Sequence, residues 1–102
     1  MDLQIPEAIQ TRIIEHYEAD KQLTVHMEEC AELIQALSKI LRNKDDKEAF
    51  NACVEHLTEE IADVLVCINQ MQIIFDISDK ALSDIISYKL VRQMRRIEYD
   101  NK

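Results

Sequence analysis

The chain contains no glycine, no tryptophan and only one proline among its 102 residues. Glycine and proline are the residues that most often end helices and build the tight turns of β-hairpins. Their scarcity excludes a turn-rich β architecture and predicts an all-α fold. The length suits a single core, so residues 1–102 are expected to form one domain without a linker.

Positive charge is also scarce. Lys and Arg number 12 against 20 Asp and Glu, which gives a formal net charge of −8. Such a surface repels polyanions, and no stripe of basic and aromatic side chains offsets it. The composition therefore argues against a nucleic-acid polymer as ligand. A small phosphorylated ligand fits if metal ions neutralise the acidic site.

The sequence lacks the patterns of export, membrane insertion and disulfide bonding. No basic-then-apolar signal pattern is present, and apolar runs are interrupted well before the ~18 residues that a membrane span needs. The three cysteines, Cys30, Cys53 and Cys67, form an odd number without C-x-x-C spacing, so reduced core thiols are expected. We therefore expect a soluble, cytoplasmic protein without a membrane partner.

Four series of apolar residues at steps of three and four predict four helices. Their expected bounds are 7–18, 21–43, 47–76 and 79–98. Asp20 is the expected N-cap of the second helix and Ser78 that of the fourth. The third helix would be on the order of 40 Å long, more than the roughly 33 Å diameter of a compact globule of this length. We expect an elongated bundle of four to five helices that pairs through its long helices into a dimer or tetramer.

Two acidic pairs lie on the second and third of these helices. Because a helix turns ~100° per residue, Glu60 falls inside the apolar stripe of the third helix. A charged carboxylate there is costly unless something pairs with it. Asp63 lies at the edge of that stripe, and Glu29 and Glu32 occupy the matching margin of the second helix.

Four carboxylates between two helices repel one another in a low dielectric, and protonation or bound divalent cations relieve that repulsion. Hard oxygen ligands of this kind suit Mg²⁺ or Mn²⁺. Acids three residues apart are also common on solvated helix faces, so ordinary surface charge is the competing interpretation. The position of Glu60 on the buried side of its helix argues against ordinary surface charge. Glu28 and Glu59 lie on more exposed arcs and are expected at the surface.

The histidines do not fit the main rival metal site. A di-iron carboxylate bundle needs a Glu-x-x-His motif on two helices, and no acid stands three positions before His16, His26 or His56. His26 lies on the apolar side of its helix, where we favour a hydrogen-bonded core histidine over one that contacts a base. His16 and His56 give no signal that stands out from background.

The order of the acids resembles a known signature. Glu29 and Glu32, a spacer of 27 residues, and then Glu60 and Asp63 resemble the ExxE…ExxD signature of the MazG-like, all-α nucleoside triphosphate pyrophosphohydrolases. The resemblance extends over roughly residues 21–97 and includes the stretches EECAELIQAL and EEIADVL. It implies that these four acids hold Mg²⁺ ions.

The resemblance also implies a reaction and further site residues. Enzymes of that family cleave a nucleotide between its α- and β-phosphates and release monophosphate and pyrophosphate. Lys89 and Arg92 look like the family's Lys-x-x-Arg on the last helix, which would contact phosphate oxygens; their competing role is to complement the helix dipole. The implied assembly is a dimer, often paired into a tetramer, with the site walled partly by a partner subunit.

Three functions therefore compete. The first is Mg²⁺-dependent hydrolysis of (deoxy)nucleoside triphosphates, which clears surplus or non-standard nucleotides. The second is hydrolysis of phosphoribosyl-ATP by a related enzyme of similar size and acid motifs. The third is a non-catalytic dimeric adaptor whose acids form salt bridges between subunits. The base, the sugar, the number of metal ions and the acid that activates water stay open.

Overall fold

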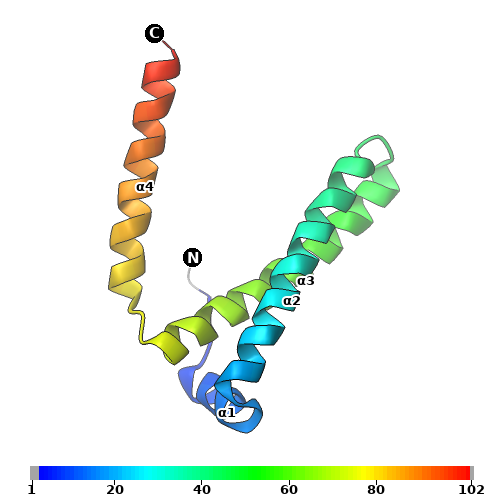
Figure 1. The fold of residues 1–102 in the computed structure, drawn as a ribbon. Helices are drawn as coiled ribbons and strands as arrows, with labels where there is room; N and C mark the ends of the chain where they lie inside the picture. Colours follow the sequence, from blue (N-terminus) through cyan, green and yellow to red (C-terminus); the bar gives the residue numbers. More distant parts are fainter. Residues whose placement is uncertain (1–2, 102) are drawn as a thin grey trace.

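The computed structural model describes residues 3–101, which contain four α-helices and no strand. The helices are α1 (Glu7–Tyr17), α2 (Ala19–Arg42), α3 (Lys47–Phe75) and α4 (Asp79–Asp100), shown in Figure 1. The predicted all-α class is confirmed. Each helix begins and ends within two residues of its expected position, because the apolar periodicity that defines a helix also marks where it stops.

Helices α2 and α3 form an antiparallel pair, and α1 packs against both of them near the start of α2 (Figure 1). Asp46 caps α3 by accepting the Ala49 N–H at 3.1 Å. The expected Asp20 cap of α2 is wrong: the helix follows directly on Glu18, whose φ is 70°, and Asp20 lies in the first turn. Among the described apolar side chains, only Ala36 and Cys67 are fully buried, so the core of one chain is small.

A buried polar network lies where α1, α2 and α3 meet. The amide of Gln70 is at its centre: Oε1 accepts from Gln22 Nε2 at 3.0 Å and from His26 Nε2 at 2.7 Å. Its Nε2 donates to Gln10 Oε1 at 2.9 Å, and Gln10 Nε2 donates to the carbonyl of Val66 at 3.0 Å. All four network side chains are more than nine-tenths buried. The expectation of a hydrogen-bonded core histidine at position 26 is thereby confirmed.

A short, well-bonded turn joins α3 to α4. Asp76 ends α3 in the left-handed conformation with a φ of 54°, and Ser78 Oγ caps α4 by accepting a backbone N–H at 3.0 Å, as predicted. Gln72 Nε2 donates to the carbonyl of Ile77 at 3.2 Å and to Asp79 Oδ1 at 2.8 Å. These hydrogen bonds hold α4 at a bend of 119° to α3.

Beyond this turn α4 projects away from the rest of the chain (Figure 1) and packs along none of the other helices that the structure describes. Apart from Leu82, every residue of α4 is exposed. Its large exposed hydrophobic side chains are Ile85, Ile86, Tyr88, Leu90, Val91, Met94, Ile97 and Tyr99. One chain therefore does not close into the expected bundle, because the bonded turn directs α4 away from α2 and α3.

The chain is elongated, as predicted. Its radius of gyration is 17.2 Å, compared with about 13 Å for a compact domain of this length. The accessible surface of 8419 Å² is roughly 2,400 Å² more than the ~6,000 Å² typical of a monomer of this mass. Within the described range no single helix is long and apolar enough to cross a membrane. Helices α3 and α4 meet that length and composition only when they are counted together across their bend.

Candidate metal centre

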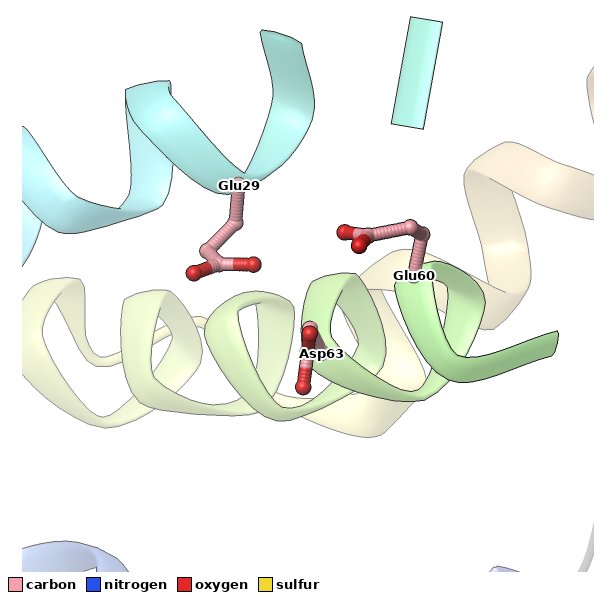
Figure 2. A group of neighbouring side chains, drawn as sticks. All are labelled: Glu29, Glu60 and Asp63. Atoms are coloured by element: carbon pink, nitrogen blue, oxygen red, sulfur yellow. The ribbon is translucent and has the colours of Figure 1, made fainter. Parts of the chain in front are cut away.

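Helices α2 and α3 bring three of the four predicted acids together. Glu29 of α2 and Glu60 and Asp63 of α3 each offer a carboxylate oxygen, and these three oxygens lie within 4.8 Å of one another. Figure 2 shows the Glu29 carboxylate reaching from α2 toward α3, with the Glu60 carboxylate directed toward it. The spacing of three residues keeps Glu60 and Asp63 on one side of α3.

The three acids differ in burial. Glu60 is 8% exposed, Glu29 is half-buried and Asp63 is exposed. The prediction that Glu60 lies within the apolar stripe of its helix is thereby confirmed. The Oε2 atoms of Glu29 and Glu60 are both buried and have no hydrogen-bond partner among the described residues. Leaving such an oxygen without a partner costs about 1–3 kcal/mol or more, and a bound cation would remove that cost.

Negative charge accumulates at this place. The pKa of Glu29 is raised above its ordinary value, first by burial and then by the charges of Glu32, Asp63 and Glu60. Burial, followed by the charge of Glu29, raises the pKa of the neighbouring Cys67 thiol to about 11. That thiol is protonated near neutral pH and is therefore a poor nucleophile and metal ligand. A divalent cation would offset the neighbouring negative charges, which are the second cause of both raised pKa values.

A small open hollow adjoins the acids. Its volume is about 190 Å³, whereas pockets that enclose a small-molecule ligand hold roughly 300–1,000 Å³. It is lined by Gln22, Val25, Glu29, Asp63, Val66, Cys67 and Gln70. One chain therefore forms only part of a wall around a ligand as large as a nucleotide.

The other predicted site residues lie outside the group of three acids. Glu32 is exposed on α2, one turn after Glu29, and contributes to the raised pKa of Glu29. Lys89 and Arg92 are exposed on α4, where the Arg92 guanidinium lies over the Tyr88 ring at 5.9 Å. Because α4 projects away from α2 and α3, these two basic residues do not lie near the acids of the same chain.

His56 is a neighbour of the site that the sequence pattern did not single out. Its Nε2 lies 3.2 Å from Glu60 Oε1, one turn earlier on α3. The available signal was the spacing of four residues, which places two side chains on the same helix face. Many pairs of residues on helices have that spacing. It points to His56 only once Glu60 is known to be buried.

Comparison of the chain with protein-family models, with curated protein sequences and with solved structures found no match. The acidic group and its surroundings are therefore the basis on which a function can be proposed.

Proposed function

We propose that this protein binds Mg²⁺ between α2 and α3 and hydrolyses (deoxy)nucleoside triphosphates to monophosphate and pyrophosphate. The supporting observation is the convergence of Glu29, Glu60 and Asp63, two of which keep a buried carboxylate oxygen without a partner in the described structure. Carboxylate oxygens are the protein ligands that Mg²⁺ and Mn²⁺ prefer. Ordinary surface charge does not account for a glutamate that is 8% exposed.

Each site residue has a task in this proposal. Glu29, Glu60 and Asp63 would hold the cation, and Glu32 at the rim would join them or take the proton of the attacking water. When bound, the cation would stabilise negative charge on the phosphates and lower the pKa of a water molecule bound to it. Lys89 and Arg92 would donate hydrogen bonds to phosphate oxygens. The expected role is clearance of unwanted nucleotides from the cellular pool.

The proposed site needs a second copy of the chain. The hollow beside the acids is too small for a nucleotide, and the two basic residues lie on a helix that projects away from the acids. Both gaps would close if α4 of one copy lay across α2 and α3 of another. Two such chains together have an excess surface of about 4,800 Å², which falls in the range of roughly 2,000–5,000 Å² that obligate dimers bury in total. The proposed working form is a homodimer or homotetramer.

The reaction is tested by measuring pyrophosphate release from a panel of ribo- and deoxyribonucleoside triphosphates and phosphoribosyl-ATP. We expect turnover of at least one nucleoside triphosphate with Mg²⁺, complete loss after chelation with EDTA, and recovery with Mn²⁺. Turnover of phosphoribosyl-ATP alone would favour the second function instead. A wild-type protein that hydrolyses no member of the panel with either metal would refute the enzymatic proposal.

The assembly is tested by light scattering on the eluting protein. The wild type should show two or four times the chain mass of 12.0 kDa. Leu90→Glu, in the middle of the exposed apolar face of α4, should shift it toward the single-chain mass because a charge there opposes burial. Lys80→Glu, in the first turn of the same helix, where the lysine side chain is 83% exposed, is the control and should stay associated. A wild type of 12.0 kDa at micromolar concentration would contradict the proposed assembly.

Whether two copies share one site is tested by measuring the activity of mixed variants. Glu60→Gln and Arg92→Ala chains should each be inactive alone, and mixing them should restore part of the activity. One hybrid site would then combine intact acids with an intact arginine. Mixing Glu60→Gln with Glu29→Gln should restore nothing, because every site would still lack one acid. Absence of recovery in the first mixture would place all site residues in one chain.

A further inference from the structure

His56 holds one oxygen of the most buried acid of the site. Its Nε2 lies 3.2 Å from Glu60 Oε1, which is within ion-pair distance. The other oxygen, Oε2, is buried without a partner among the described residues. The two oxygens of Glu60 therefore differ: His56 contacts Oε1, whereas Oε2 has no partner among the described residues. Figure 2 shows the Glu60 carboxylate directed toward Glu29.

We propose that His56 is a positioning residue for the divalent cation: it fixes Glu60 Oε1 so that Oε2 is left to bind the metal. This inference rests on the proposed metal site and does not require the proposed reaction. A glutamate side chain has three rotatable bonds, and the negative charges of Glu29 and Asp63 repel it. The contact with His56 in the preceding turn would keep the Glu60 carboxylate directed at the site before the cation arrives.

The competing explanation is an ordinary ion pair on a helix surface. Such pairs contribute little, because water screens both charges. The chain contains a suitable example in Lys80 and Asp84, which have the same spacing and lie 2.7 Å apart, with both side chains mostly exposed. The pair of His56 and Glu60 differs because its side chains are 41% and 11% exposed, compared with 83% and 65% for Lys80 and Asp84, and because Glu60 belongs to the acidic group.

The two explanations are separated by Mn²⁺ binding, measured from the electron paramagnetic resonance signal of the free ion. His56→Leu removes the donor, whereas His56→Gln places an N–H donor the same number of bonds from the backbone. Since hydrogen-bond partners of metal ligands change metal affinity about 10–100-fold, His56→Leu should weaken binding by that factor and His56→Gln by less than about threefold. Lys80→Leu is the control for loss of an ordinary surface pair and should bind as the wild type does.

Thermal unfolding of the wild type and the three variants gives a second measurement, the rise in melting temperature on adding Mn²⁺. A purely structural role of His56 would not change that rise. Because a ligand that binds only the folded state stabilises it, Mn²⁺ should raise the melting temperature of the wild type, His56→Gln and Lys80→Leu more than that of His56→Leu. Wild-type Mn²⁺ affinity in His56→Leu would overturn the inference, as would equal losses in the Leu and Gln variants. A wild type that binds no Mn²⁺ would overturn both the inference and the metal site, whereas binding without nucleotide turnover would contradict only the reaction.

Discussion

Glu60→Gln should abolish nucleotide hydrolysis and leave the fold at least as stable as that of the wild type. Glutamine keeps the size of the side chain but removes the charge that a divalent cation needs, so the rate should fall about 10²-fold or more. The metal-free fold should tolerate the change, because one of several mutually repelling carboxylates is neutralised. Steady-state pyrophosphate release and urea unfolding without metal measure the two effects separately.

The neighbouring Glu59 offers a matched control for this prediction. It lies on the same helix and is exposed, so Glu59→Gln makes the same chemical change outside the acidic group and should keep nearly full activity. A loss of several kcal/mol of stability in Glu60→Gln would identify Glu60 as a structural partner of His56. That result would favour the non-catalytic adaptor over the enzyme.

Gln70→Leu should strongly destabilise the fold, whether or not the protein is an enzyme. Gln70 is hydrogen-bonded to Gln10, Gln22 and His26, all of them buried. Leucine has nearly the same size but leaves three buried polar groups without partners, at about 1–3 kcal/mol each. A loss of at least about 3 kcal/mol would consume much of the 5–15 kcal/mol that stabilises an ordinary domain. Urea unfolding followed by circular dichroism measures this loss.

Gln35→Leu is the control for the network. Gln35 is exposed on α2, so the same substitution there should change the unfolding free energy by less than about 0.5 kcal/mol. If Gln70→Leu were as stable as Gln35→Leu, the network would contribute no net stability. The small apolar core and, in the proposed assembly, the surfaces between copies would then have to supply all of the stability.

Helix positions were predictable because apolar periodicity and capping residues are local signals. Ser78 illustrates this: a residue with a capping side chain directly before a periodic segment marks the start of α4. The direction of α4 was not predictable, because it depends on the left-handed residue Asp76 and on the bonds that Gln72 makes across the turn. A non-glycine residue with positive φ gives little sequence signal.

Around the candidate site, too, some residues could be recognised from the sequence and others could not. Glu60 was recognisable from the sequence because a charge within an apolar stripe is unusual. Gln10, Gln22 and Gln70 were not, because glutamine is common on solvated helix faces and only the meeting of three helices buries these amides together. In the proposed assembly, whether Arg92 reaches the acids depends on how copies of the chain associate, and no helix pattern specifies that.

The proposed reaction is tested most directly by phosphorus NMR of a nucleoside triphosphate incubated with the protein in water enriched in a heavy oxygen isotope. We predict that monophosphate and pyrophosphate form in equal amounts, only with a divalent metal present, and that the heavy oxygen enters the monophosphate. Formation of nucleoside diphosphate and orthophosphate, or hydrolysis that chelation does not stop, would contradict metal-dependent cleavage between the α- and β-phosphates.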